Sequence, residues 1–285
     1  MKIIRSIPEM QTVSRNLHND TKKIGLVPTM GALHDGHLSL LHKAQQHSDV
    51  SVMSIFVNPT QFGPSEDFNQ YPRPFEEDCK KAEEHGCDIL FVPYAKEVYP
   101  DTHMTYVSVE NLTETLEGAS RPGHFRGVTT IVLKLFTMVT PDIAVFGRKD
   151  AQQAIVIRRM VTDLNLPVEL IIADTIREKD GLAISSRNSY LTDAERIAVP
   201  VIYKGLSRAQ EEYNRGERHA EKLLQLIGTT YNDTKLIKTE YIAIVDAETL
   251  RPVDVLTGTT LIAVACRTTQ SHTRLIDNIV LGGHL

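Results

Sequence analysis

Short apolar runs alternate with helical patterns over the first two-thirds of the chain. The runs occupy residues 24–27, 50–57, 88–92, 142–147 and 168–173. Between them, apolar side chains recur at helical spacing, as at Leu38, Leu41 and Ala44 and again over residues 128–139 and 149–164. Because parallel strands are joined by crossover helices, this alternation predicts a Rossmann-like, doubly wound α/β domain whose parallel sheet is covered on both faces.

The pattern changes near residue 188. Thr192 and Glu195 have the Ser/Thr-x-x-Glu spacing of a helix start, and helical patterns continue to about residue 231. Short strands are then predicted at residues 241–245, 260–265 and 275–281, with no crossover helices between them. We therefore predict two domains, the α/β domain at residues 1–187 and a smaller C-terminal α+β domain at residues 188–285.

Composition and charge narrow the class of protein. The 285 residues are 41% hydrophobic and 24% charged, which is ordinary for a globular protein, and the formal net charge is −5. An acidic chain is a poor general binder of nucleic acid or anionic membranes, so neither is expected as a partner. No apolar run has the length of a membrane span, and the three cysteines form no CxxC pair. A cytoplasmic location is therefore expected.

The turn after the first predicted strand carries two histidines, His34 and His37, with Gly31 and Gly36 beside them. A helix begins there, and a helix N-terminus offers unpaired N–H groups and partial positive charge to a phosphate. Imidazoles at this point would add donors to a charged transition state. Plain capping residues or two ligands of a metal are the alternatives, although two histidines alone make no zinc site.

Three further polar turns follow predicted strands. Residues 58–62 hold two carboxamides, and residues 147–150 form a Gly-Arg-Lys-Asp turn followed by two glutamines. Residues 177–188 hold two adjacent serines and an arginine, a donor set that could wrap a polyphosphate. A glycine-rich turn at residues 118–127 adds Arg121 and Arg126. Each segment has a plainer interpretation, namely an ordinary turn, a capped polar loop or a solvated linker.

Several common nucleotide and hydrolase motifs are missing from the sequence. It has no GxxxxGK[ST] loop, no GxGxxG after the first strand and no GxSxG elbow. The remaining pattern combines paired histidines, a Gly-x-Lys-Asp turn and a Ser-Ser-Arg loop. Together they indicate attack at an α-phosphate, a reaction in which positioning and positive donors carry most of the catalysis.

Six ordered motifs resemble those of the pantothenate synthetase (pantoate–β-alanine ligase) family. They are PTMGALHDGH at 28–37, FVNPTQF at 56–62, YPR at 71–73, GHFRGV at 123–128, FGRKDAQQ at 146–153 and DGLAISSRN at 180–188. The C-terminal part is similar to the family's small domain by its layout and by RLIDN at 274–278. The family belongs to the nucleotidyltransferase superfamily whose HIGH motif reads His34-Asp35-Gly36-His37 in this chain.

The resemblance implies a reaction in two steps. ATP and (R)-pantoate give pantoyl adenylate and pyrophosphate, and β-alanine then displaces AMP to give pantothenate. The substrates would be ATP, (R)-pantoate and β-alanine, with Mg²⁺ accompanying ATP, mainly on its phosphate oxygens. The resemblance also implies a homodimer. Because an adenylate intermediate has to be kept from water, we expect a cover over the active site, formed by residues 71–78 or by the C-terminal domain.

Site residues are implied by the same resemblance, position by position. His37, His34 and Lys149 would be catalytic, Gln61 and Gln153 would bind pantoate, and Gln61 would also lie near β-alanine. The implied ATP-binding residues are Met30, Gly31, Ala32, Leu33, His34, Asp35, Gly36, His37, Gly147, Arg148, Lys149, Asp150, Ile176, Ile184, Ser185, Ser186 and Arg187. Within that set Lys149 would bind phosphate, Asp150 the ribose, Ile176 the adenine through its backbone, and residues 184–187 the triphosphate. Asp78 is a candidate for outer contact with Mg²⁺.

Two positions depart from the family pattern, and two other functions compete with the ligase. Ile184 replaces a frequent methionine, which a backbone contact tolerates, and Lys179 replaces a frequent proline, which is expected to loosen the loop and slightly weaken ATP binding. A nucleotidyltransferase that stops at the nucleotidylated product is one alternative, and the pair Gln61 and Gln153, suited to a small polyol acid, argues against it. A non-enzymatic nucleotide-binding module is the other, and it would not require His34, His37, Lys149 and Arg187 together.

Overall fold

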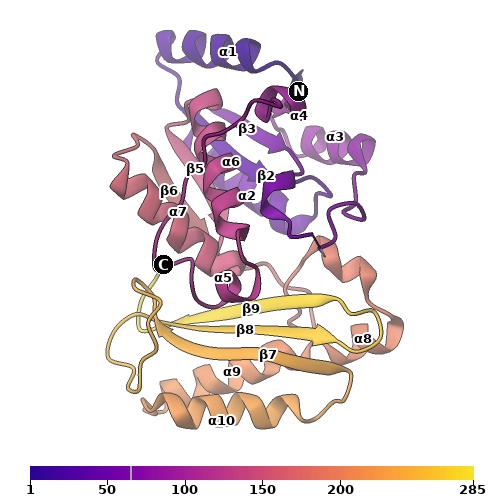
Figure 1. The fold of residues 1–285 in the computed structure, drawn as a ribbon, viewed down its shortest axis with the longest axis vertical. Helices are drawn as coiled ribbons and strands as arrows, with labels where there is room; N and C mark the ends of the chain where they lie inside the picture. Colours follow the sequence, from indigo (N-terminus) through magenta and orange to yellow (C-terminus); the bar gives the residue numbers. More distant parts are fainter. Residues whose placement is uncertain (65) are drawn as a thin grey trace. The chain divides into compact units, whose positions relative to one another are not determined.

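The computed structural model describes residues 1–64 and 66–285. The chain forms two compact units (Figure 1). Unit 1 comprises Met1–Gly147 and Val156–Ala173, and unit 2 comprises Arg148–Ile155 and Asp174–Leu285. Among the described residues, no helix combines the length and apolar character that crossing a bilayer would need.

A six-stranded sheet forms the centre of unit 1, and every pair of neighbouring strands in it is parallel. The strands, in spatial order, are β1 (Lys2–Ile4), β4 (Ile89–Phe91), β3 (Val50–Ile55), β2 (Ile24–Thr29), β5 (Ile143–Gly147) and β6 (Glu169–Ala173). The predicted fold class is confirmed. The sequence pattern did not reveal β1, because a three-residue strand with one buried side chain is too short to show a period.

Helices of unit 1 connect these strands in two directions. They are α1 (Ile7–Asn19), α2 (Asp35–His47), α3 (Phe75–Glu84), α4 (Ala95–Val98), α5 (Glu117–Ser120), α6 (His124–Val139) and α7 (Ala151–Asp163), whose first residues belong to unit 2. The connections through α2 and α3 run from β2 to β3 and from β3 to β4, toward the β1 edge of the sheet. Those through α1, α6 and α7 run from β1 to β2, from β4 to β5 and from β5 to β6, toward the β6 edge. Right-handed crossovers place the two sets on opposite faces of the sheet, and α1 accordingly packs against α6.

The strand order reverses direction between β2 and β5. In open α/β sheets, ligands bind in the crevice at such a switch point, outside the carboxyl ends of the strands. The chain leaves β2 through the predicted histidine turn, and it leaves β5 through the short 3-10 helix η2 (Arg148–Asp150). The topology therefore brings the strand end that carries the histidines to the expected ligand position.

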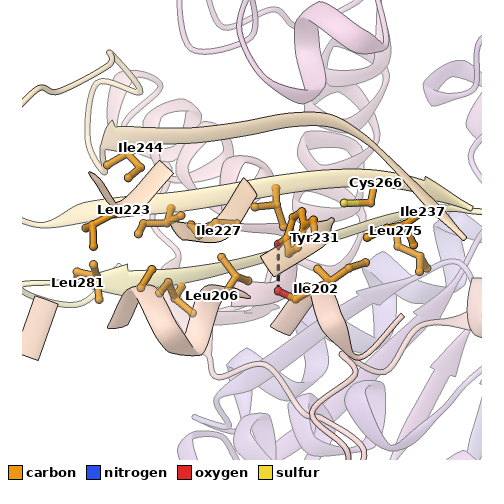
Figure 2. Packing of buried hydrophobic residues seen from close by; sticks show 14 of the residues in the cluster. Ile202, Leu206, Leu223, Ile227, Tyr231, Ile237, Ile244, Cys266, Leu275 and Leu281 are labelled. Carbon is orange, nitrogen blue, oxygen red and sulfur yellow. Dashed lines mark hydrogen bonds between the residues drawn. The ribbon is translucent and has the colours of Figure 1, made fainter. Parts of the chain in front are cut away.

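Unit 2 packs helices on a three-stranded antiparallel sheet, with strand order β7 (Ile237–Asp246), β8 (Thr260–Thr268) and β9 (Arg274–Leu281). Its further helices are η3 (Ser186–Tyr190), α8 (Asp193–Ala198), α9 (Val201–Asn214) and α10 (Ala220–Tyr231). The core fills the space between α9, α10 and the sheet, and within it the Tyr231 hydroxyl donates to the Ile202 carbonyl oxygen at 3.0 Å (Figure 2). The predicted capping box of Thr192 and Glu195 starts α8.

The division of the chain differs from the predicted boundary after residue 187. Residues 174–187 belong to unit 2, where Arg177 pairs with Asp277 of β9 and forms a backbone bridge with Ala183. Residues 148–155 also belong to unit 2, and there Asn278 binds the backbone of η2. Long-range contacts of β9 side chains decide the boundary, and hydrophobic periodicity carries no signal for them.

Candidate active site

A buried carboxylate holds the turn after β2. Gly31 and Ala32 have φ values of +82° and +50°, a left-handed conformation that reverses the chain. Asp78, only 1% exposed, accepts hydrogen bonds from the backbone N–H groups of Ala32 at 2.8 Å and Leu33 at 2.7 Å. Burial raises the pKa of Asp78, and these two hydrogen bonds act against that shift. The carboxylate thus sets the path of the chain into α2.

The two histidines of this turn lie ring against ring. His34 precedes α2 as its N-cap residue, and the His37 ring stacks on the His34 ring with centroids 4.0 Å apart. A Cβ atom on Gly36 would lie 2.9 Å from Cε1 of His34, so the glycine leaves room for this imidazole. The structure therefore places both imidazoles, half-buried, at the N-terminus of α2, as the spacing predicts.

The carboxamides of residues 58–62 meet the same turn. Gln61, in the 3-10 helix η1 (Pro59–Gln61), donates from Nε2 to the Met30 sulfur at 3.1 Å. Asn58 is buried and donates from Nδ2 to Gln61 Oε1 at 3.0 Å and to the Gly127 carbonyl at 3.1 Å. Within unit 1 the predicted ATP-contacting Met30 and the predicted pantoate ligand Gln61 are therefore in direct contact.

A cavity of about 170 Å³ opens beside Gln61. Its lining residues are Thr60, Gln61, Phe62, Gly63, Pro64, Tyr106, Pro122, Gly123, His124, Arg126 and Gly127. The Arg126 guanidinium lies over the Tyr106 ring, 3.7 Å from its centroid, which orients the cation by a cation–π contact. A Cβ atom on Gly127 would lie 2.4 Å from the Thr60 carbonyl oxygen, so only glycine permits this approach of α6 to η1.

A chain of polar contacts supports the cavity wall, and we call Glu66, Arg121 and His124 the Arg121 network. Arg121 binds Glu66 through two hydrogen bonds, of 2.6 Å from Nε and 2.8 Å from Nη2. Burial would raise the pKa of Glu66, but the hydrogen bonds and charge of Arg121 outweigh it and lower this pKa to about 2. Arg121 also reaches Nε2 of His124 at 3.1 Å.

The same network fixes the proton of His124. Burial, reinforced by the charge of Arg121, lowers the pKa of His124 to about 4, so its imidazole is neutral at pH 7. Nε2 faces the Arg121 donor and must accept, whereas Nδ1 faces the Gln61 carbonyl oxygen at 2.9 Å and must donate. His124 therefore anchors the backbone of Gln61, whereas Asn58 binds its side chain.

The glycine-rich turn at residues 118–127 is visible in the sequence, but its pattern assigns none of its residues to the site. The structure adds His124 and Arg126 from that turn, together with Glu66 and Tyr106. The Gly-His-Phe-Arg-Gly run was a usable signal, because small and basic residues preceded a helix. Tyr106 lies in a segment without periodic pattern, and nothing in its neighbourhood marks it as functional.

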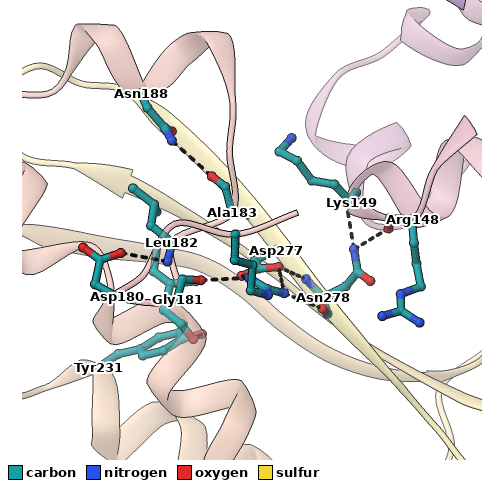
Figure 3. A network of polar contacts seen from close by, with 12 residues as sticks. Arg148, Lys149, Asp180, Gly181, Leu182, Ala183, Asn188, Tyr231, Asp277 and Asn278 are labelled. Atoms are coloured by element: carbon teal, nitrogen blue, oxygen red, sulfur yellow. Dashed lines mark hydrogen bonds and ion pairs between the residues drawn. The ribbon is translucent and has the colours of Figure 1, made fainter. Parts of the chain in front are cut away.

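In unit 2, the predicted ATP residues Arg148, Lys149 and Asp150 form η2, which follows Gly147 at the end of β5. Lys149 Nζ lies 3.7 Å from Asp150 Oδ1, and Arg148 Nη1 lies 2.9 Å from Asp174 Oδ1. Asn278 binds the backbone carbonyl of Lys149, and the Lys149 side chain extends away from that contact (Figure 3). The predicted pantoate ligand Gln153 is half-buried in the first turn of α7.

The predicted adenine and triphosphate segments are joined within unit 2. The Ile184 N–H donates to the Ile176 carbonyl oxygen at 3.0 Å, so the two predicted backbone contacts are neighbours. Ser185 Oγ accepts from the Arg187 N–H at 3.3 Å and caps η3, which contains Ser186. Asn188 Nδ2 donates to the Ala183 carbonyl oxygen at 3.1 Å (Figure 3).

Lys179 lies in a loop whose two neighbouring acids are both paired. Arg196 binds Glu178 at 2.5 Å and Asp180 at 2.6 Å, one on each side of Lys179. These ion pairs hold the tip of the loop where the frequent proline is missing. The predicted weakening of ATP binding by Lys179 stays a prediction.

The fold and this site define a class of protein: a doubly wound α/β protein with paired histidines beyond the switch-point strand β2. A sequence profile of pantoate-beta-alanine ligase matches residues 2–280. The chain belongs to the pantoate-beta-alanine ligase family.

Relatives at high coverage agree with the family match. The chain is 50% identical over 281 residues to the pantothenate synthetase of Acetivibrio thermocellus and 52% identical over 281 residues to that of Heliobacterium modesticaldum, each covering 99% of both chains. The crystal structure of pantothenate synthetase from Thermus thermophilus superposes with a TM-score of 0.91 at 42% identity, covering 98% of this chain and 99% of that one. The chain is accordingly an enzyme of ATP-dependent ligation of pantoate and β-alanine.

A further similar structure is that of a ligand complex. It is the pantoate-beta-alanine ligase of Francisella tularensis, complexed with beta-gamma ATP and β-alanine, with a TM-score of 0.79 at 34% identity over 98% of this chain and 97% of that one. Together with the family match, it disfavours the alternative of a nucleotidyltransferase that stops at the nucleotidylated product.

Proposed function

We propose that this enzyme joins pantoate to β-alanine through pantoyl adenylate, with His34 and His37 as donors to the α-phosphate. The observation that carries the proposal is the stacked pair of imidazoles at the N-terminus of α2, beyond the switch-point strand β2. A carboxylate attacking phosphorus needs no general base. The imidazoles therefore act by stabilising charge on the phosphoryl oxygens, together with the positive end of the α2 dipole.

The proposal places (R)-pantoate on the amides of Gln61 and Gln153. Gln61 is suited to this role because its backbone carbonyl is anchored by His124 and its side-chain oxygen by Asn58, so its position is defined before a substrate binds. A neutral amide binds hydroxyl and carboxylate groups without adding charge to the site. Pre-organised binding of this kind lowers the entropy that substrate positioning would otherwise cost.

The cavity beside Gln61 is the proposed β-alanine pocket. It contains one oriented cation, Arg126, which fits the carboxylate of a small amino acid, and its wall includes the neutral imidazole of His124. An imidazole without charge does not repel the ammonium group that must lose a proton and attack the adenylate. The Francisella ligase, described in complex with β-alanine, supports this ligand for a relative with the same fold.

ATP is proposed to contact residues of both η2 and the loop that follows β6. Lys149 binds phosphate oxygens and Asp150 the ribose, in line with the family resemblance. Ile176, with 37% of its surface exposed, offers its backbone to adenine, and Ser185, Ser186 and Arg187 bind the triphosphate. Hydroxyl, amide and guanidinium donors suit phosphate oxygens, and an arginine can bind two of them at once.

Magnesium is proposed to arrive with ATP on its phosphate oxygens. Asp78 is a poor fit for the predicted outer contact, because both of its oxygens accept backbone N–H groups and the side chain is buried. Across residues 1–64 and 66–285, no three His, Cys, Asp or Glu side chains gather as a metal site would require. The ion is thus part of the MgATP substrate, the form in which Mg²⁺ keeps several waters and few protein ligands.

The homodimer, the covering role of the C-terminal domain and the cytoplasmic location remain proposals drawn from the family resemblance and the composition. Sedimentation velocity of the purified protein distinguishes a dimer from a monomer directly. A sedimenting species at the mass of one 31.9 kDa chain over the micromolar range would contradict the dimer.

The decisive experiment follows both half-reactions with ATP, (R)-pantoate and β-alanine. Pyrophosphate exchange into ATP should require pantoate but not β-alanine, and pantothenate should form only with all three. His37→Ala should lower adenylation by about 10²-fold or more, the usual effect of removing one transition-state donor. His42→Ala is the matched control, because His42 lies on the same helix with its ring exposed and in contact with His85.

Two outcomes would contradict the proposal. Pyrophosphate exchange that proceeds without pantoate would exclude an acyl adenylate formed from it. Full activity of His37→Ala, with His42→Ala equally active, would remove the catalytic role of the stacked histidines.

A further inference from the structure

Asn278 of β9 binds the backbone of η2 with both hydrogens of its amide. Nδ2 donates to the Arg148 carbonyl oxygen at 2.9 Å and to the Lys149 carbonyl oxygen at 2.8 Å (Figure 3). Asn278 is 4% exposed, so this amide is shielded from competition by water. A short 3-10 helix has few internal hydrogen bonds of its own, and two of the carbonyls of η2 are satisfied by this one side chain.

Asp277, the preceding residue, holds the loop before η3. Its carboxylate accepts from Arg177 Nη1 at 2.5 Å and Nη2 at 2.8 Å, and it is only 5% exposed. Arg177 also donates to the Gly181 carbonyl oxygen at 3.1 Å and lies over the Tyr203 ring, 3.7 Å from its centroid. The backbone bridge between Arg177 and Ala183 closes the hairpin that runs into residues 184–187.

Asp277 and Asn278 are also joined to each other by a hydrogen bond. The Asn278 N–H donates to Asp277 Oδ1 at 2.7 Å, so the carboxylate that binds Arg177 also orients the backbone that carries the Asn278 amide. One dipeptide of β9 thus contacts η2 through its amide and the residue 177–183 hairpin through its carboxylate. Alternating strand geometry points successive side chains in opposite directions, which allows one strand to serve two segments.

We infer that Asp277 and Asn278 are positioning residues for ATP: Asn278 sets the location of Lys149, and Asp277 sets that of residues 184–187. This inference rests on the proposed ATP-binding roles of those segments. Neither residue is assigned to touch the nucleotide. A neutral amide is required at 278, because its two donors face two carbonyl oxygens, and a carboxylate there would place acceptors against acceptors.

The test measures pantoate-dependent pyrophosphate exchange and overall ligation in Asn278→Ala and Asn278→Asp. In Asn278→Ala the KM for ATP should rise by about tenfold, the scale for losing hydrogen bonds that position a binding group. Asn278→Asp, of nearly equal size, should be at least as impaired. The KM for β-alanine should stay within about twofold, because its proposed pocket involves none of these segments.

Glu240→Gln is the matched control. Glu240 lies on β7 of the same sheet and forms ion pairs with Arg267 at 2.8 Å and Arg274 at 2.7 Å, without contact to η2 or to the 177–183 hairpin in the described structure. Its loss should lower the unfolding temperature without changing the KM for ATP. If Asn278→Ala behaved in the same way, with a lower unfolding temperature and an unchanged KM, the residue would be structural only and the inference would be wrong.

A double-mutant cycle with Lys149→Ala separates this inference from the proposed function. If Asn278 acts through Lys149, then Asn278→Ala should add little to the ATP defect of Lys149→Ala, whereas independent effects would multiply. Multiplying effects would overturn the positioning role. A Lys149→Ala enzyme with normal KM for ATP would instead contradict the proposed ATP site, and that result is distinguishable because it concerns the single variant.

The Asp277 arm has its own rescue test. Asp277→Asn should raise the KM for ATP, and Asp277→Glu should raise it less. The reason is that only a carboxylate can bind the Arg177 guanidinium by two charge-assisted hydrogen bonds. Equal defects in both variants, at equal unfolding temperature, would contradict the role of the ion pair.

Discussion

Each unit contains an arginine–carboxylate pair of nearly the same geometry, and the two pairs differ in how deeply the carboxylate is buried. The Arg121 network of unit 1 joins Arg121 to Glu66 at 2.6 and 2.8 Å, and unit 2 joins Arg177 to Asp277 at 2.5 and 2.8 Å. In the first pair, Arg121 also binds the imidazole of His124, which in turn binds the Gln61 carbonyl oxygen. In the second pair, Asp277 accepts from the backbone N–H of Asn278, whose side-chain amide binds the Lys149 carbonyl oxygen.

The chemical difference lies in the group that connects each ion pair to a segment proposed to bind substrate. An imidazole titrates near neutral pH in water, whereas an amide does not titrate at all. The contact of His124 Nε2 with Arg121 therefore depends on keeping the ring neutral, because a protonated ring has no acceptor nitrogen, and the burial and the Arg121 charge that keep it neutral are lost on unfolding. The contact of Asn278 with η2 is independent of pH. Two similar ion pairs thus support segments with different sensitivities to acid.

The largest expected effect comes from removing the arginines. Arg177→Ala leaves Asp277, 5% exposed, as an unpaired buried carboxylate, and should lower the free energy of unfolding by roughly 3–5 kcal/mol. Arg121→Ala should lower it by about 1–3 kcal/mol, because Glu66 is 22% exposed and water can reach it. Urea unfolding at pH 7 measures both. A larger loss in Arg121→Ala than in Arg177→Ala would invert the comparison.

The next effect is specific to unit 1 and to pH. The pKa of His124 is about 4 in the folded protein against 6.5 for an ordinary histidine, so from pH 6.5 down to 4 the unfolded chain binds more protons than the folded one. Stability therefore falls as the pH falls through this window, by about 2 kcal/mol at pH 5 from this group alone.

His124→Gln tests this contribution, because glutamine can donate to the Gln61 carbonyl but does not titrate. Urea unfolding at pH 7.5 and pH 5 should show a smaller difference in stability for the variant than for the parent protein. Glu66 does not obscure the result. Its pKa is lowered from 4.5 to about 2, so its contribution to the stability of the protein is lost only as the pH falls below about 4.5. An unchanged pH dependence would show that His124 titrates normally.

The smallest effect compares one helix glycine from each unit. In α2, Gly36→Ala would place Cβ 2.9 Å from the His34 ring and displace the imidazole, so adenylation should fall by about tenfold with little loss of stability. In α10, a Cβ on Gly228 meets only Ile242, at 4.0 Å, and Gly228→Ala should stabilise the protein by roughly 0.5–1 kcal/mol with unchanged activity. Equal activities of both variants would show that the exact place of the His34 ring is unimportant.

Much of the fold could be predicted from local pattern. Five of the six strands of the parallel sheet and the helix start at Thr192 follow from hydrophobic period and capping chemistry, and both are confirmed. The spacing of His34 and His37 across a strand-to-helix turn also determines that both imidazoles lie at one helix N-terminus. These features depend on residues a few positions apart, which is the range over which backbone geometry imposes a period.

Only the tertiary structure decided what supports the site. Asp78 binds the turn at residues 32–33, and Asn278 binds η2, across 46 and 130 positions of sequence, respectively. The approach of His124 to Gln61 spans 63 positions, and the same kind of contact moves residues 148–155 and 174–187 into unit 2. Hydrogen bonds between a side chain and a distant backbone have no period along the chain, because they depend on where packed strands and helices bring the two groups together. The sequence alone therefore determined the elements and the chemical groups of the site, and the packing of those elements determined which groups hold them in place.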